Sequence, residues 1–297
     1  MRKIFVILIL VLLVNNISCT KSSFSNQNNA AIENQKIFKN VINRLLNEGI
    51  DTNFIFKLIS NSKTQFDEKY VKINVTGYLT PTDYSHFYNQ NSIYKAKEFL
   101  QNNYETLDQA EKKFNVPKEV ITSILWIETR FGNYLGTHHL LSVFLSTAMC
   151  NEPEYIELNK KEIELKFPGD SQKVDSLKRV LDVRTRKKAN WAIEELLALE
   201  KMHSKYSIQV GDLYGSWAGA FGICQFLPSS FVKYAIDGNK DGIIDLFNTT
   251  DAIFSVANYL NKNGWGKTQD EQRKAVFAYN NSGAYVNAVL QLSSLIK

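Results

Sequence analysis

Helical spacing of apolar residues is the pattern that most restricts what this chain can form. From Lys36 onward, apolar residues recur at intervals of three and four. The first such stripe consists of Phe38, Val41, Ile42, Leu45 and Leu46. Only residues 70–77, YVKINVTG, look strand-like, and a small irregular or β element is expected near residues 237–250. The sequence therefore predicts a mainly α protein with a minor β part, of the α+β class.

Helical spacing continues on both sides of a charged middle segment. One helix is expected from about Ile93 to Phe114, and another after Pro117, because a first helical turn tolerates proline. A third is expected from Trp191 to about Lys201. The segment between them, residues 151–186, is highly charged and predicts an excursion on the surface. Its breaks are Pro153, Pro168 and Gly169.

The first 19 residues have the order of a secretion signal. Two basic residues precede an apolar run, residues 4–14, and the small residue Ser18 stands before Cys19. The apolar run is shorter than the roughly 20 residues that cross a bilayer core. A cysteine in this position resembles a bacterial lipoprotein processing site, where residues 1–18 are removed and the thiol receives lipid. The alternative is a plain signal peptide with an incidental cysteine.

A lipid on Cys19 would give the following polar segment a function. Residues 19–35 lack apolar periodicity and are expected to form a flexible tether between the lipid and the folded part. The protein is then expected in the cell envelope, on the periplasmic side, and anchored by lipid to a bacterial membrane.

Charge and cysteine content exclude some other functions. The net charge is +5 and there is no dense basic block, so the sequence gives no support for nucleic-acid binding. Besides Cys19, the chain has Cys150 and Cys224. In an oxidising envelope they could pair, but two buried free thiols fit the sequence equally well.

Glu128 is the carboxylate that the helical pattern singles out. It follows Ile121 by seven residues and Ile124 by four, and therefore shares their apolar helix face. Burial raises the pKa of a carboxylic acid and keeps it protonated near neutral pH. A general acid acting on a glycosidic oxygen needs this property. The structural alternative is a glutamate that pairs with Arg130 or lies at the frayed end of the helix.

Four segments, in this order, resemble the lytic murein transglycosylase B family. Residues 126–132, WIETRFG, resemble the motif that contains the family's catalytic glutamate. Residues 216–231, SWAGAFGICQFLPSSF, resemble its second signature. Residues 251–265 and the AYNNS stretch at 278–282 also match. The resemblance covers roughly residues 75–297.

The resemblance implies a lysozyme-like fold, in which a helical body holds a deep groove for the sugar chain. The lysozyme-like region is expected at residues 36–297, with its catalytic core at about 117–265. The helical segments 36–116 and 266–297 would pack around this core. The excursion at 151–186 is longer than the family's pattern.

The resemblance also implies the reaction of a peptidoglycan lytic transglycosylase. Glu128 would protonate the oxygen between N-acetylmuramic acid and N-acetylglucosamine. It would then take the proton of the C6 hydroxyl, which closes a 1,6-anhydro ring. The residues that match the family's substrate-binding positions are Ser216, Gln225, Tyr279, Asn280 and Tyr78. Cys224 stands where the family has glycine.

The expected partners are peptidoglycan glycan strands and the membrane that holds the lipid anchor, and the protein is expected to be a monomer. Two other functions stay open. One is a lysozyme-like hydrolase, in which water attacks the sugar. The other is a catalytically silent lipoprotein that binds peptidoglycan, against which the presence of Glu128 argues.

Residues 237–245, DGNKDGIID, have the spacing of an EF-hand-type calcium loop. Ca²⁺ takes about six to eight oxygen ligands, which alternate acidic and amide side chains can supply. Asn248 stands at the position of the usual closing glutamate, and the family implies closure by Asp251 instead. The predicted ligands are Asp237, Asn239, Asp241, Ile243 and Asp251. A structural Ca²⁺ is thus the expected cofactor, and a solvated turn without metal is the alternative.

Overall fold

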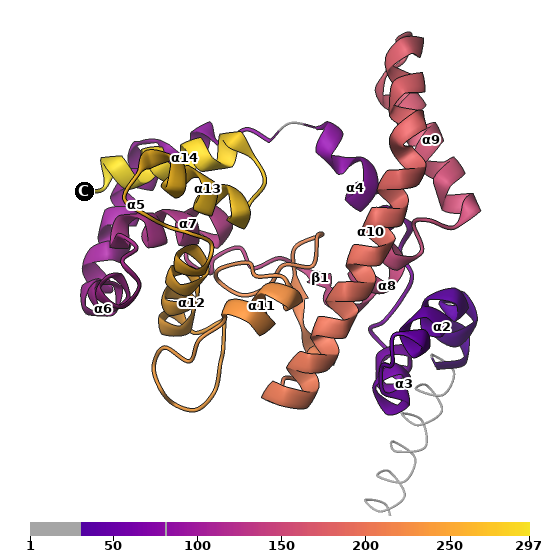
Figure 1. Cartoon of the computed structure of the whole chain (residues 1–297), viewed down its shortest axis with the longest axis horizontal. Coiled ribbons are helices and arrows are strands. Elements are labelled where there is room, and N and C mark those ends of the chain that lie inside the picture. Colours follow the sequence, from indigo (N-terminus) through magenta and orange to yellow (C-terminus); the bar gives the residue numbers. More distant parts are fainter. Residues whose placement is uncertain (1–30, 81) are drawn as a thin grey trace, which may run out of the picture.

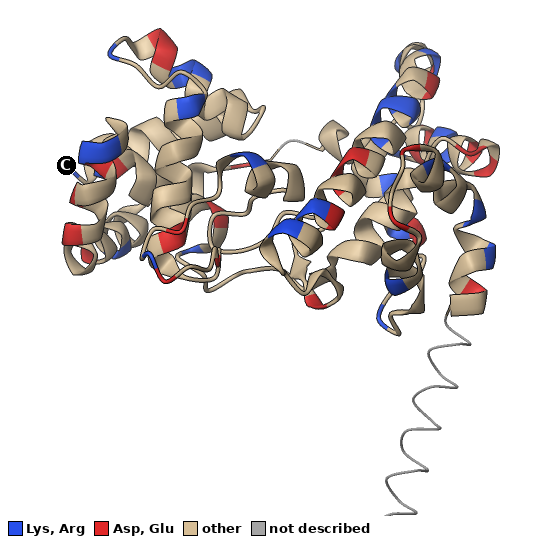
Figure 2. Cartoon of the chain, turned by 60° about the horizontal axis from the view of Figure 1, so that its bottom comes forward, with Lys and Arg blue, Asp and Glu red and all other residues tan. Residues whose placement is uncertain are grey.

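The computed structural model describes residues 31–80 and 82–297, and helices make up most of this part (Figure 1). Within it, the β structure is small: β1 (His138–His139) pairs antiparallel with β2 (Tyr214–Gly215). The predicted mainly helical class with a minor β part is therefore confirmed. Basic and acidic residues are interleaved over the helices (Figure 2).

The described chain begins with short amphipathic helices. Residues 31–37 are helical and lead into α2 (Lys39–Asn47), α3 (Thr52–Ser60) and α4 (Glu68–Thr76). The expected tether is therefore too long at its C-terminal end. Asn34 is buried there, and its amide is satisfied by hydrogen bonds that it donates to the carbonyls of Ile59 and Thr64, at 2.8 and 3.1 Å. The rest of the tether and the predicted signal lie outside the described residues.

The predicted strand at residues 70–77 is wrong. This segment forms most of α4 and the start of the 3₁₀ helix η1 (Gly77–Leu79). Its buried side chains include Tyr70, Val71, Asn74 and Val75, which lie on one helical face. That face packs on two other helices, α8 (Leu140–Ala148) and α9 (Pro153–Lys166). Tertiary packing thus overrides the β propensity of the valines and the isoleucine.

The expected helix at 93–114 is two helices. They are α5 (Gln90–Asn102), which follows the 3₁₀ helix η2 (Ser85–Tyr88), and α6 (Tyr104–Phe114). Asn103 separates them, and its side-chain amide donates to the carbonyl of Phe99 at 2.9 Å. The polar side chain thus satisfies a carbonyl at the end of α5.

The charged segment 151–186 is a protruding helical hairpin, in agreement with a surface excursion (Figure 1). It consists of α9 and the first half of α10 (Ser171–Tyr206). Pro153 begins α9 and does not interrupt it, because a first-turn proline has no hydrogen bond to lose. The break expected at 168–169 is the turn, where Gly169 has φ +84°.

The remaining elements complete two groups of helices (Figure 1). They are the 3₁₀ helix η3 (Val210–Asp212), α11 (Pro228–Tyr234), α12 (Thr249–Lys262), α13 (Gln269–Tyr279) and α14 (Gly283–Leu295). Helix α7 (Lys118–Thr129) packs among α5, α6, α12 and α14, whereas α10 packs against α8, α9 and α11. The segment between α11 and α12 is irregular, as expected for residues 237–250.

Among the helices of residues 31–80 and 82–297, none combines the length and the apolar character that crossing a membrane requires.

Candidate active site

Glu128 lies in the last turn of α7, on a helix whose other faces are buried. Ile121 and Ile124 are fully buried on the same face, as the spacing predicted. The helix ends at Thr129, one residue after Glu128, because Arg130 and Phe131 adopt left-handed backbone conformations with φ of 49° and 60°. A packed helix end thus gives the Glu128 carboxyl a fixed position at the edge of the core.

Arg130 does not neutralise this carboxylate. Its guanidinium stacks over the ring of Tyr134, 4.8 Å from the centroid. The carboxyl of Glu128 instead accepts a hydrogen bond of 2.6 Å from the hydroxyl of Tyr285. The structure therefore contradicts the reading in which Glu128 is held as the partner of Arg130.

Tyr285 on α14 is a site residue that the sequence reasoning missed. It is fully buried, and it belongs to an apolar stripe that continues with Val286, Val289 and Leu292. A buried tyrosine needs a partner for its hydroxyl, and this need was the available signal. Tyr285 donates to Glu128, and the bond restricts the orientation of the carboxyl.

Burial raises the pKa of Glu128 from its ordinary 4.5 to about 7, and the hydrogen bond from Tyr285 opposes the rise. Part of the side chain remains accessible, but the carboxyl is surrounded by protein and poorly hydrated. The groups that sense its charge are Tyr84, Cys224, Tyr279 and Tyr285. Burial is the largest cause of the raised pKa of each of these four, so they stay neutral when Glu128 ionises. At neutral pH Glu128 can therefore give or take a proton.

The predicted pair Tyr279 and Asn280 lies beside Glu128, at the end of α13. The hydroxyl of Tyr279 donates to the carbonyl of Cys224, and its ring lies parallel to that of Tyr285 with centroids 6.4 Å apart. The amide of Asn280 bonds to the Tyr84 hydroxyl and offsets part of the effect of burial on the Tyr84 pKa. The fold thus gathers this pair, Tyr285 and Glu128 into one site.

Ser216 and Gln225 share the loop that follows β2. The Ser216 hydroxyl accepts a hydrogen bond from the Ala220 amide at 3.1 Å. The Gln225 amide donates to the carbonyls of Gly222 and Leu135, at 3.0 and 3.3 Å. The residue before Gln225 is Cys224. Its thiol is buried, and its carbonyl accepts the hydrogen bond from the Tyr279 hydroxyl. The cysteine that replaces glycine here points into the core.

This loop is joined to the end of α7. The hydroxyl of Thr129, the residue after Glu128, donates to the carbonyl of Ile223 at 2.7 Å. The same hydroxyl accepts the amide of Gly132 at 2.9 Å. The loop that carries Ser216 and Gln225 is therefore fixed relative to the carboxyl.

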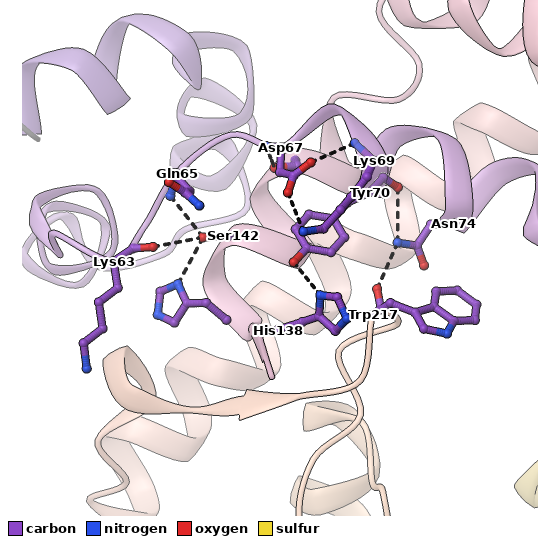
Figure 3. A network of polar contacts seen from close by, with 11 residues as sticks. Lys63, Gln65, Asp67, Lys69, Tyr70, Asn74, His138, Ser142 and Trp217 are labelled. Atoms are coloured by element: carbon purple, nitrogen blue, oxygen red, sulfur yellow. Dashed lines mark hydrogen bonds and ion pairs between the residues drawn. The ribbon is translucent and has the colours of Figure 1, made fainter. Parts of the chain in front are cut away.

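Tyr78 lies apart from the aromatic cluster around Glu128. Its exposed ring on η1 packs under the guanidinium of Arg184 on α10, 3.6 Å from the ring centroid. Figure 3 shows the hydrogen bonds that join α4, the helix before η1, to β1 and to the loop after β2. Asn74 donates to the Trp217 carbonyl at 3.4 Å, and the Tyr70 hydroxyl bonds to His138 at 2.9 Å. Tyr78 thus lies toward the Ser216–Trp217 end of the loop, and its role stays a prediction.

The acidic loop before α12 closes around backbone amides. Asp237 accepts hydrogen bonds from the amides of Asp241 and Gly242, at 3.2 and 2.9 Å. Asp251 is buried in the first turn of α12 and accepts the amides of Gly238 and Asp245, at 2.9 and 2.8 Å. Asp251 therefore joins the two ends of the loop through their backbone amides, and its role as a calcium ligand stays a prediction.

The donor set of this loop fits a hard cation. Asp237, Asn239 and Asp241 contribute oxygen side chains on one turn, and Asn239 donates to Asp241 at 2.8 Å. In the described ranges, no group of three or more His, Cys, Asp or Glu side chains is arranged to hold a metal. Besides the carboxylates, a Ca²⁺ site would need the side chain of Asn239 and the backbone oxygen of Ile243 as ligands. Binding of Ca²⁺ to this loop therefore stays a prediction.

Cys150 and Cys224 are both free and buried. Burial raises the pKa of Cys150 to about 12, which keeps its thiol protonated. The reading with two buried thiols, which the sequence left open, is confirmed.

Comparisons with solved structures identify the fold. Lytic transglycosylase Slt35 of Escherichia coli, in complex with calcium, superposes with a TM-score of 0.64 and 20% identity over 89% of this chain and 92% of that one. SltB3 of Pseudomonas aeruginosa, in complex with NAG-NAM-pentapeptide, gives a TM-score of 0.63 and 17% identity over 90% and 79%. These neighbours confirm the predicted lysozyme-like helical fold.

Sequence comparisons identify the family. Membrane-bound lytic murein transglycosylase B of Escherichia coli (strain K12) is 32% identical over 167 residues, which are 56% of this chain. The match spans only 37% of the length of that relative. The family model of the transglycosylase SLT domain matches residues 33–277. Because this match includes most of the chain, with Glu128, the chain belongs to the transglycosylase SLT domain family.

Proposed function

We propose that this protein is a peptidoglycan lytic transglycosylase that cleaves the β-1,4 bond between N-acetylmuramic acid and N-acetylglucosamine. The observation that carries the proposal is Glu128, held by Tyr285 at 2.6 Å and with a pKa of about 7. A single group with this pKa serves as acid and as base at neutral pH. The family of the chain, and the glycan ligand in the SltB3 structure, support peptidoglycan as the substrate.

The proposed reaction uses Glu128 twice. In its protonated form, Glu128 gives its proton to the bridging oxygen as the bond from that oxygen to C1 breaks. The resulting carboxylate then takes the proton of the C6 hydroxyl, whose oxygen bonds to C1 of the same sugar. No water is consumed, Glu128 ends protonated, and one product carries a 1,6-anhydro end.

The surroundings of Glu128 favour this course over a two-carboxylate mechanism. Ordinary glycosidases place a second carboxyl within about 5 to 9.5 Å of the first, as nucleophile or water activator. Burial and the hydrogen bond from Tyr285 are the causes of the shift of the Glu128 pKa, and no carboxylate is among them. The C6 hydroxyl of the substrate is therefore the proposed nucleophile.

The proposed substrate contacts near Glu128 come from two segments of the chain. Asn280 and Tyr279 come from the end of α13, and Ser216 and Gln225 come from the loop tied to α7. Their hydroxyl and amide groups would hydrogen-bond the sugar hydroxyls and N-acetyl groups. Tyr78 is proposed to contact the glycan farther along. We propose that the protein acts as a monomer, since all these groups come from one chain.

We also propose that the loop at residues 237–251 binds Ca²⁺ in a structural role. The alternate oxygen donors of the loop and the calcium complex of Slt35 support this proposal. We expect Ca²⁺ to raise the melting temperature, because a ligand that binds only the folded state stabilises it by about 2.7 kcal/mol at a hundredfold excess over its Kd. Asp241→Ala should remove the gain.

Differential scanning fluorimetry with Ca²⁺ and with chelator measures this effect. Asp175→Ala on the exposed side of α10 is the matched control and should keep the full gain. Equal melting temperatures of the wild type in calcium and in chelator would contradict a calcium site.

The cell-envelope location is a further part of the proposal. We propose that Cys19 carries lipid and holds the protein on the periplasmic side of a bacterial membrane. Cys19→Ala should then move the protein from the membrane fraction to the soluble envelope fraction. Fractionation with immunodetection, and labelling with a radioactive fatty acid, measure the change. Equal membrane association together with equal labelling of both forms would show that Cys19 is not the anchor.

A further inference from the structure

The N-terminal helices leave apolar side chains open to solvent. Helical residues 31–37, α2 and α3 enclose a depression of about 430 Å³, which we call the apolar groove. Its apolar lining consists of Ile32, Ile42, Leu46, Ile55, Phe56 and Ile59. Of these, Ile32 is 67% exposed, Phe56 55% and Leu46 43%. A gathering of large exposed apolar side chains marks an interaction surface.

Lysines border the apolar groove. Lys36 and Lys39 line a second depression that also includes Ile32 and Ile42, and both lysines are exposed. Apolar side chains flanked by lysines on short amphipathic helices are the combination that binds the interface of anionic membranes.

The apolar groove lies at the start of the described chain. Ala31, which lines it, is 12 residues after Cys19, and a chain of this length spans at most about 40 Å when fully extended. A lipid on Cys19 would therefore hold the groove close to the bilayer surface. Helices α2 and α3 lie on the side of the molecule opposite α7 and α14, which carry Glu128 and Tyr285 (Figure 1).

We propose that the apolar groove docks on the surface of an anionic lipid membrane. Ile32 and Phe56 enter the headgroup region, and Lys36 and Lys39 face the lipid phosphates. Docking directs the Glu128 site away from the membrane, toward the peptidoglycan. This inference deepens the proposed function. The lipid on Cys19 determines only where in the cell the groove meets a membrane, whereas the contact with lipid is made by residues 31–60 alone.

Vesicle partitioning of the mature chain, residues 19–297, with Cys19→Ala tests the contact, because this variant has neither the predicted signal segment nor the thiol that would be acylated. We expect binding to vesicles of phosphatidylglycerol and phosphatidylethanolamine. Ile32→Asn with Phe56→Ser should lower the partition coefficient by at least about tenfold, since burial of large apolar side chains drives insertion. Lys36→Glu with Lys39→Glu should lower it by about fivefold per lysine on anionic vesicles, and less at high salt.

Leu165→Ser is the matched control, because Leu165 is 76% exposed on α9, outside the groove. It should leave partitioning unchanged, and thermal melts should show that all variants fold. Equal partitioning of the groove variants, or no vesicle binding by the parent, would overturn the proposal. So would a dimer that the groove variants dissolve, since the occupant would then be a second copy. A chain that partitions as expected but does not cleave peptidoglycan would refute the proposed activity alone.

Discussion

Replacing Glu128 with glutamine is expected to remove nearly all cleavage of peptidoglycan while the protein still folds. Glutamine keeps the shape of the side chain and can still accept the hydrogen bond from Tyr285, but it has no proton to transfer. Positioned acid–base catalysis contributes roughly 10² to 10⁴-fold, and a residue that performs both transfers should reach the upper end. Release of soluble muropeptides from purified peptidoglycan, measured by chromatography, gives the rate.

Glu119→Gln provides the control for this experiment, because Glu119 lies in the first turn of the same helix, beside Lys118. This variant should keep its activity. A Glu128→Gln enzyme as active as the wild type would refute the proposed mechanism.

Mass spectrometry of the wild-type products separates the two enzymatic readings. Transglycosylation gives 1,6-anhydro ends, which are lighter by one water than hydrolysed ends and have no reducing sugar. Reducing ends alone would mean that water attacks C1 and that the protein is a hydrolase. Glu128 would then act with a water molecule, and the C6 hydroxyl would have no role.

The position of Glu128 could be predicted because helical periodicity is local. Ile121 and Ile124 determine the buried face of α7, and the glutamate four residues later must share it. The family resemblance, and not periodicity, indicated Asp251 as the residue that closes the acidic loop. Resemblance added Tyr279 and Asn280, which periodicity alone would have assigned to packing.

Contacts between distant segments could not be predicted in this way. Tyr285 meets Glu128 across 157 positions in the chain, and no local pattern records that distance. Residues 70–77 were misread for the same reason. Their valines favour a strand locally, but Val71 and Val75 become helical because α8 and α9 cover that face. The hairpin that supplies α9 was itself predicted only as an excursion.

The raised pKa of Glu128 also has a consequence for stability. In the unfolded chain the carboxyl has its ordinary pKa of 4.5, whereas burial raises the folded-state value to about 7. The folded protein therefore binds this proton more tightly than the unfolded chain does. The free energy of unfolding accordingly falls as the pH rises from about 4.5, and the loss is complete above about 7. The difference between the two pKa values corresponds to about 3 kcal/mol.

Glu128→Gln is therefore expected to stabilise the protein, and by more as the pH rises. Glutamine is neutral at every pH and keeps the bond from Tyr285, so it never places a charge in the buried site. Urea unfolding should show little gain at pH 4 and about 3 kcal/mol at pH 8. Glu105→Gln on α6 makes the same chemical change on the exposed surface and should show no such trend. A gain for Glu128→Gln that stays constant from pH 4 to pH 8 would mean that the carboxyl ionises as freely in the fold as in water. The enzyme would then lack the neutral-pH acid on which the proposed reaction depends.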